Sequence, residues 1–253
     1  MIEIKSQREI DKIKASSDIL VKTMNAIKDI IGPGVKTIEL DRKAAEVIKN
    51  NGGRAAFLGY GGPERPFPAS ICASVNEQVV HGIPGDYTLK DGDIIGIDLG
   101  VEKDGYFSDA CYTFAIGNVS KEVKRLLKVT ENSLYKGIDA FSEKNRLFDI
   151  SSSIQQFVEK NGFSVVREFV GHGIGRKLHE EPQIPNYGTK GHGIRLKKGM
   201  VFAIEPMVNM GDYRVEVMED GWTVVTKDRK FSAHFEHTVV LGDNGPEILT
   251  RFF

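Results

Sequence analysis

Three short motifs occur twice in this chain, in the same order and about 110 residues apart. The pairs are Glu46–Gly52 with Gln156–Gly162, Phe57–Gly61 with Phe169–Gly173, and Leu89–Gly92 with Leu196–Gly199. A repeat of this length is too long for the stacked units of a solenoid. It predicts a duplicated α-α-β-β unit, and therefore two similar halves (about 1–118 and 119–253) around a pseudo-twofold axis. A site between such halves would draw its ligands from both.

Hydrophobic spacing and turn signals predict the elements of each half. Helices are expected from the capping box at Ser6 to Gly32, and over 37–50, 120–140 and 147–160. Strands are expected over 71–80, 93–101, 106–116, 200–207, 215–217, 222–226 and 235–241. No linker or low-complexity tract interrupts this order. We therefore expect one α+β domain spanning 1–253.

Composition excludes several classes of protein. The formal net charge of -1 argues against a broad nucleic-acid surface, which needs clustered basic residues. Cys72 and Cys111 form no disulfide framework, and they are expected to be free thiols in a reducing compartment. The N-terminus has no signal-peptide pattern, and no apolar run approaches the ~20 residues that cross a bilayer. The sequence predicts a cytoplasmic protein without a membrane partner.

Carboxylates occur within two apolar strands. Asp98 lies in Ile94–Leu99 and Glu205 in Val201–Pro206, at equivalent places of the repeat. An ionised carboxylate in such surroundings is costly unless it is paired or bound to a metal. Two of them at matching positions favour a shared site.

A third carboxylate, Asp109, lies in the strand that should return from Asp98. A two-residue loop at Lys103-Asp104 or at Asp104-Gly105 would place Asp98 and Asp109 on one face, either opposite each other or diagonally related. A three-residue loop would place them on opposite faces. On one face the two charges would repel each other, and a divalent cation would relieve that repulsion.

Glu236 and His172 complete a candidate metal set. His172 lies in the glycine-rich stretch 169–181, where glycine at every second position suits a backbone that passes close to another group. Four carboxylates and one imidazole favour Mn, Fe(II), Co or Mg over a thiolate-type zinc site. Their negative charge exceeds what one divalent ion neutralises, so two ions are expected. Such a pair activates a bridging water in metal-assisted hydrolysis.

The order of these five residues, with the segments around them, resembles the methionine aminopeptidases. The strongest matching segments are Asn76–Pro84, Asp91–Asp98, Gly171–Arg176, Ile204–Asn209, Asp220–Thr223 and Glu236–Thr238. The resemblance implies the pita-bread fold, a curved antiparallel sheet with helices on its outer face. Only 31 positions separate Glu205 from Glu236, so the chain resembles the bacterial type I enzymes, which lack the helical insertion of type II.

The resemblance also implies metal ligands and catalytic residues. Asp98 would bind one ion, His172 and Glu205 the other, and Asp109 and Glu236 would bridge the two. Two divalent metal ions would be bound per chain, and their identity could be Co, Mn, Fe(II), Zn or Ni. The substrates implied are the N-termini of nascent polypeptides with a small second residue, cleaved by a monomer; contact with the ribosome stays open.

Three of the matching residues would do the chemistry of amide hydrolysis. Glu205 would be the general base, His179 would stabilise the oxyanion, and His81 would help to protonate the leaving nitrogen. Four residues match positions around the family's methionine pocket: Tyr60, Cys72, Leu178 and Trp222. The other three histidines, His192, His234 and His237, are expected to be structural.

Two departures leave the shape of the pocket open. The segment Gly61–Pro68 is longer than the bacterial pattern and offers no clear counterpart of an expected aromatic residue. Leu178 stands where an aromatic residue is common. Two alternatives remain at this point: a proline-directed peptidase of the same fold, and a non-catalytic binding module.

Overall fold

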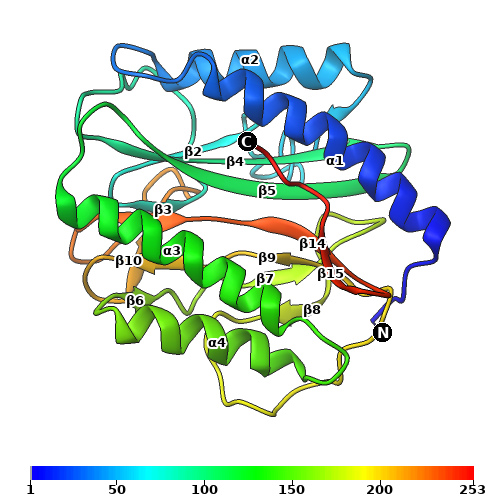
Figure 1. The fold of residues 1–253 in the computed structure, drawn as a ribbon. Helices are drawn as coiled ribbons and strands as arrows, with labels where there is room; N and C mark the ends of the chain where they lie inside the picture. Colours follow the sequence, from blue (N-terminus) through cyan, green and yellow to red (C-terminus); the bar gives the residue numbers. More distant parts are fainter. Residues whose placement is uncertain (1) are drawn as a thin grey trace.

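Four helices cover one side of the molecule in the computed structural model, which describes residues 2–253. They are α1 (Gln7–Lys28), α2 (Thr37–Asn50), α3 (Lys121–Ala140) and α4 (Leu147–Lys160). α1 begins at the predicted capping box, where the Ser6 N–H donates to the Glu9 carboxylate at 3.0 Å, and it ends before the predicted Gly32. In Figure 1, α1 and α2 lie beside the strands of the first half, and α3 and α4 beside those of the second.

The first half contains five strands: β1 (Arg54–Ala55), β2 (Cys72–Val75), β3 (Gln78–Val80), β4 (Ile94–Lys103) and β5 (Tyr106–Ala115). β4 pairs with β1, β2 and β5, always antiparallel. The sequence predicts one continuous strand over 71–80, and this prediction is wrong. A turn at Asn76, whose φ is 55°, divides it, and β3 joins a different sheet through β12.

The second half contributes ten short strands. They are β6 (Ser164–Val165), β7 (Gly171–Gly173), β8 (Glu180–Ile184), β9 (Val201–Ile204), β10 (Met207–Asn209), β11 (Val215–Val217), β12 (Val224–Thr226), β13 (Ser232–His234), β14 (His237–Gly242) and β15 (Gly245–Ile248). Their main sheet has the order β15-β14-β9-β7-β8. The strand predicted over 200–207 is divided at Glu205-Pro206, since proline has no N–H for a ladder.

The histidine stretch forms β7, which the sequence did not predict as a strand. β7 lies between β8 and β9, and a Cβ added at Gly171 would be 2.5 Å from the Ala203 carbonyl oxygen. The close backbone approach expected from the alternating glycines is confirmed here.

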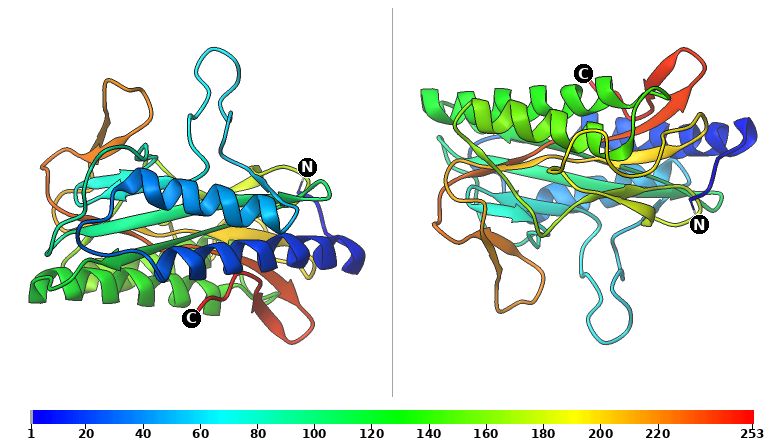
Figure 2. Two further views of the ribbon diagram at one scale, coloured as in Figure 1. Left: turned by 90° about the horizontal axis from the view of Figure 1, so that it is seen from above. Right: turned by 90° about the horizontal axis from the view of Figure 1, so that it is seen from below.

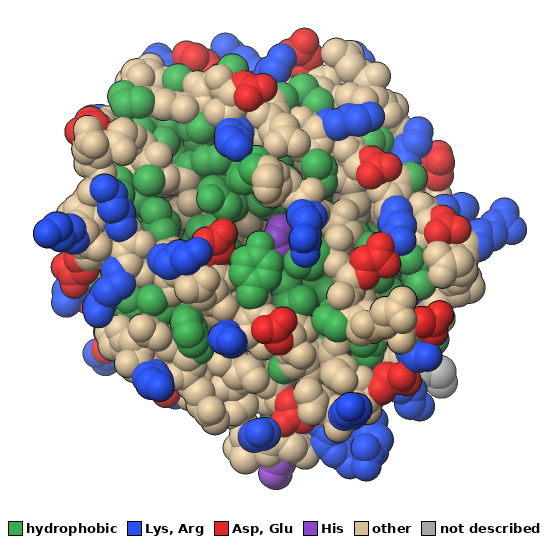
Figure 3. Space-filling view, viewed as in Figure 1, with side chains coloured by type: hydrophobic (Ala, Val, Ile, Leu, Met, Phe, Trp, Pro, Cys, Tyr) green, Lys and Arg blue, Asp and Glu red, His purple; other side chains and the backbone are tan. Residues whose placement is uncertain are grey.

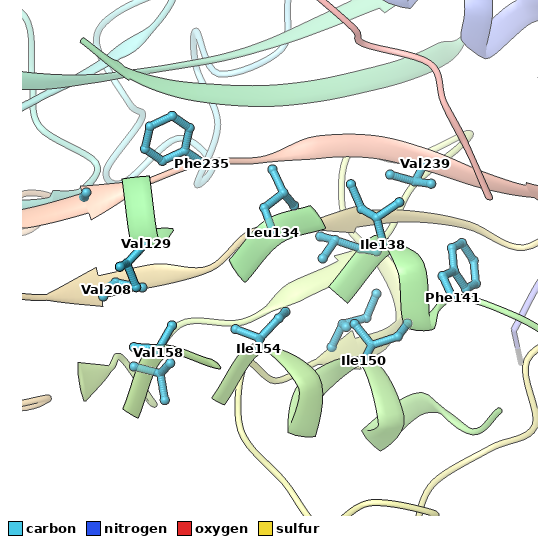
Figure 4. Packing of buried hydrophobic residues seen from close by; sticks show 14 of the residues in the cluster. Val129, Leu134, Ile138, Phe141, Ile150, Ile154, Val158, Val208, Phe235 and Val239 are labelled. Atoms are coloured by element: carbon cyan, nitrogen blue, oxygen red, sulfur yellow. The ribbon is translucent and has the colours of Figure 1, made fainter. Parts of the chain in front are cut away.

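Each half has its own hydrophobic core. Figure 4 shows side chains of α3 and α4, such as Leu134 and Ile154, packed against Val208 and Val239 of the sheet strands. A corresponding cluster lies between α1, α2 and the strands of the first half. A third cluster joins the halves, with Phe57 from the first and Leu178 from the second. The duplicated arrangement of helices around antiparallel sheets is the predicted fold class, and it is confirmed.

Two loops project on the side away from α3 and α4. They are the cyan segment around residue 60 and the orange β11–β12 hairpin in Figure 2. On the side that carries the helices, Lys and Arg are interspersed with Asp and Glu over the whole face (Figure 3). Among the described residues, no helix combines the length and the apolar character needed to span a bilayer.

Candidate metal centre

A cavity of about 300 Å³ lies between the two halves. Its walls include every residue that the sequence placed in the site: Tyr60, Cys72, His81, Asp98, Asp109, His172, Leu178, His179, Glu205, Trp222 and Glu236. The residues come from both halves, as the repeat predicted.

The β4–β5 hairpin brings the first two carboxylates together. Lys103 pairs with Tyr106, so the loop is Asp104-Gly105, and both residues have the positive φ of a type I′ turn. Asp98 is opposite Cys111, two positions from Asp109. The two carboxylates are therefore diagonal neighbours on one face, which is one of the two arrangements left open by the sequence.

The other two carboxylates lie where strands of the second half are interrupted. Glu205 follows β9, and Glu236 stands between β13 and β14. Ligand atoms of Asp109, His172 and Glu236 all lie within 4.8 Å of one another. The Nε2 atom of His172 is 3.5 Å from Glu205 Oε1 and 3.9 Å from Asp109 Oδ2. These distances place four of the five predicted ligands close to one another. The fifth, Asp98, is the diagonal neighbour of Asp109 on the β4–β5 hairpin.

Burial raises the pKa of every one of these carboxyl groups. It raises the pKa of Asp98 to about 7. For Asp109, Glu205 and Glu236 the pKa lies well above the ordinary range, because of burial first and the neighbouring carboxylates second. A cation would reverse this situation, because it stabilises the ionised forms.

His172 is held in the form that a metal ligand needs. Its Nδ1 lies 2.9 Å from the Gly173 carbonyl oxygen, which only accepts, so Nδ1–H donates. Nε2 is then left with its lone pair toward Asp109 and Glu205. Burial lowers the pKa of His172 to about 3, which keeps the ring neutral.

The buried oxygen atoms provide a test of whether a metal fits. Across residues 2–253, Asp98 Oδ1, Asp109 Oδ1 and Glu236 Oε1 are buried and lack a hydrogen-bond partner. Uncompensated buried charge is expensive, and coordination to a cation removes the cost. Oxygen and imidazole donors match divalent ions of the hard and borderline kind. The residues fit a divalent metal centre.

Two further histidines lie beside this cluster. The rings of His172 and His179 are 4.3 Å apart between centroids, and the Tyr60 hydroxyl is 2.6 Å from His179 Nδ1. A hydroxyl that donates to Nδ1 leaves the proton of a neutral imidazole on Nε2, ready to donate. His81 packs edge-on against Phe169, and burial lowers its pKa to about 4.

One aromatic residue of the cavity was not identified from the sequence. Phe67, in the segment that offered no counterpart, lines the cavity and packs edge-on against Trp222, with ring centroids 5.3 Å apart. The signal available was an aromatic residue between two prolines, Pro66 and Pro68. Phe57, Val80, Phe169 and Val170 also line the cavity and were not predicted.

His234 is a second correction. It was expected to be structural, but it lines the cavity, with Nε2 at 4.0 Å from Glu205 Oε2. That Nε2 atom is buried and has no partner in the described part of the chain. The usable signal was its position two residues before Glu236, on the same face of an extended segment.

Comparisons with known proteins agree with this geometry. The model of metallopeptidase family M24 matches residues 11–243. The chain is 56% identical to a methionine aminopeptidase of Clostridium perfringens and 51% identical to methionine aminopeptidase 1 of Bacillus subtilis; each match covers at least 99% of both chains. The crystal structure of the Thermotoga maritima methionine aminopeptidase is similar at 45% identity, with a TM-score of 0.96, over 99% of this chain and 100% of that one. A prolidase from Pyrococcus furiosus, at 23% identity and a TM-score of 0.79, shares the fold; 99% of this chain and 66% of that one are covered.

Proposed function

Because this chain belongs to metallopeptidase family M24, we infer that its cavity removes the amino-terminal methionine from polypeptides, as a type I methionine aminopeptidase. One observation carries this conclusion above the others. A buried carboxylate–histidine cluster that fits divalent metal lies in the same cavity as an apolar wall of Phe67, Cys72, Leu178 and Trp222. The cavity thus combines hydrolytic groups with a place for an apolar side chain.

The ligand assignment is the one that the resemblance implies, and the short distances around His172 are compatible with it. Asp98 would hold one ion, His172 and Glu205 would hold the other, and Asp109 and Glu236 would be shared. Four carboxylates around one neutral imidazole support two ions, because one divalent ion would leave net negative charge in a buried place. When bound, the ions acidify water and polarise the scissile carbonyl group.

The chain's own residues move the protons. Glu205 accepts a proton from the attacking water, which requires its ionised carboxylate, the form that a bound cation stabilises. His179, oriented by the Tyr60 hydroxyl, donates from Nε2 to the developing oxyanion. His81 helps to protonate the leaving nitrogen.

The methionine side chain occupies the apolar wall. A pocket of this kind discriminates by roughly 1–3 kcal/mol per methylene group, which favours methionine over shorter residues. A small second residue in the substrate is proposed from the resemblance to the methionine aminopeptidases alone. The physiological substrates proposed are new polypeptides in the cytoplasm, processed by residues 1–253 acting as a single-domain monomer.

Metal-dependent release of methionine tests the proposal. We expect chelator-treated protein to release no free methionine from a Met-Ala-Ser peptide, and added Mn, Co or Fe(II) to restore release. The Glu205→Ala variant should stay inactive with every metal.

Other outcomes would point elsewhere. Hydrolysis of Xaa-Pro peptides in place of Met-Ala-Ser would assign the site to proline-directed peptidases. Metal and peptide binding by folded protein, without hydrolysis, would indicate a binding module.

A further inference from the structure

The seam between the halves lies directly beside the metal centre. β5 of the first half and β14 of the second lie side by side there (Figure 1). A backbone hydrogen bond crosses the seam from the Glu236 N–H to the Cys111 carbonyl oxygen, at 2.9 Å. Further links across the seam come from side chains.

Two threonine hydroxyls cross the seam in equivalent ways. Thr238 Oγ1 accepts from the Asp109 N–H at 3.0 Å and donates to the Asp109 carbonyl oxygen at 2.8 Å. Thr113 Oγ1 accepts from the His234 N–H at 3.0 Å and donates to the His234 carbonyl oxygen at 2.6 Å. In a β-ladder, a neighbouring strand would accept from the N–H and donate to the C=O of such a residue. Here one threonine hydroxyl does both.

Both threonines are fully buried, with 0% exposure for Thr238 and 2% for Thr113. Because bulk solvent does not reach them, loss of either hydroxyl would leave a buried N–H and a buried C=O without that partner. The two contacts nevertheless differ in what they hold. Thr113 holds His234, which is outside the ligand set, whereas Thr238 holds Asp109.

Thr238 is itself fixed next to a second ligand. It lies two residues after Glu236, and its N–H donates to Thr250 Oγ1 at 3.1 Å. The same Thr250 hydroxyl is 3.1 Å from His237 Nδ1. The hydroxyl of Thr238 therefore connects the backbone of Asp109 to a segment that is anchored beside Glu236.

We propose that Thr238 is a positioning residue for the metal centre, and that its hydroxyl sets the separation of Asp109 and Glu236 across the seam. This inference rests on the metal site of the proposed function. Groups that orient ligands in this way typically change metal affinity by roughly 10–100-fold when they are removed. Thr113 is the matched control, because it makes the same pair of hydrogen bonds to a residue that is not a ligand.

Mn²⁺ titration of chelator-treated protein by isothermal calorimetry tests the proposal. The variants are Thr238→Val, Thr238→Ser and Thr113→Val. We expect Thr238→Val to bind Mn²⁺ at least about 10-fold more weakly, while Thr238→Ser and Thr113→Val bind as wild type does. The melting temperatures of the two valine variants should fall by similar amounts, which separates positioning from stability. In turnover of Met-Ala-Ser, Thr238→Val should lower kcat with little change in KM.

Equal Mn²⁺ affinity of Thr238→Val and wild type would overturn the inference, as would equal losses in the two valine variants. Failure of Thr238→Ser to retain affinity would also overturn it. If Thr238→Val does not fold, the comparison of Thr238→Ala with Thr113→Ala decides in the same way. Wild-type protein that binds no Mn²⁺ would instead refute the proposed metal site itself.

Discussion

The pKa of Asp98 shows how burial affects the ionisation of one carboxyl group in the metal-free protein. Its pKa of about 7 in the folded protein lies above the ~3.9 of an unfolded chain. A raised pKa contributes stability that is complete below about pH 4 and is lost as the pH rises through about 7. Ionisation of Asp98 should therefore lower the stability of the metal-free protein as the pH rises through about 7.

The Asp98→Asn variant isolates that effect. We expect metal-free Asp98→Asn to match the stability of the metal-free wild type near pH 4 and to exceed it at pH 8, because asparagine never ionises. Saturating Mn²⁺ should reverse the order at pH 8. Thermal unfolding across this pH range, with chelator or with Mn²⁺, measures both; a difference between the two proteins that does not vary with pH would contradict the burial of Asp98 as a neutral group.

Phe67 is expected to support methionine binding. Removing its ring takes away apolar contact in the cavity and the edge-on support of Trp222. We expect Phe67→Ala to lower kcat/KM for Met-Ala-Ser by about 10-fold, mainly through KM, corresponding to ~1.4 kcal/mol of apolar contact. Phe67→Leu should lose much less. Steady-state kinetics that show a lower kcat with an unchanged KM would place Phe67 outside the pocket.

At the scale of single residues, the carboxylates that line the cavity were easier to predict than its apolar lining. Asp98 and Glu205 are conspicuous because charge within an apolar strand needs a physical reason. Phe67 and His234 are not, because an aromatic residue in a loop and a histidine near a strand are ordinary. Their role depends on which loops meet over the cavity, and that is decided by contacts between the halves.

At the scale of elements, the segment before α1 secures the turn that carries His179. The Lys5 ammonium lies 2.6 Å from Glu180 Oε2, and Glu180 Oε1 accepts from the N–H groups of Arg176 and Lys177. The side chains of Lys5 and Glu180 are 2% and 12% exposed. An ion pair this enclosed, tied to backbone amides, orders the turn.

Breaking that ion pair should be costly. We expect Lys5→Met to reduce the free energy of unfolding by about 3 kcal/mol, because Glu180 is left charged and poorly hydrated. The control is Lys36→Met, which removes an ion pair with Asp86 that is 46% and 92% exposed on its two sides. That variant should lose much less stability, because both charged groups stay solvated without each other. Urea unfolding measures both; similar losses would mean that burial of Lys5 does not matter.

The elements themselves were predictable where their periodicity was regular. The helices and the β4–β5 hairpin are as expected within a few residues. β7 was missed because its alternating glycines carry no hydrophobic signal. The strand at 200–207 was predicted too long because Pro206 stands in an otherwise apolar run, and its lack of an N–H outweighs that pattern.

At the scale of the whole molecule, the two halves should unfold together. The third hydrophobic cluster and the metal site both take residues from each half. We expect scanning calorimetry to show one transition, with equal calorimetric and van't Hoff enthalpies, and Mn²⁺ to raise its midpoint as a unit. Two transitions, of which Mn²⁺ shifts one, would indicate that the halves are separable.

The seam also has a consequence in time. During synthesis Asp98 and Asp109 leave the ribosome first, and Glu236, Thr238 and Thr250 follow much later. A growing chain that stops before Glu236 lacks one of the five proposed metal ligands, however well its first half is folded. The order of the residues along the chain therefore postpones a complete set of these ligands until the second half has been made.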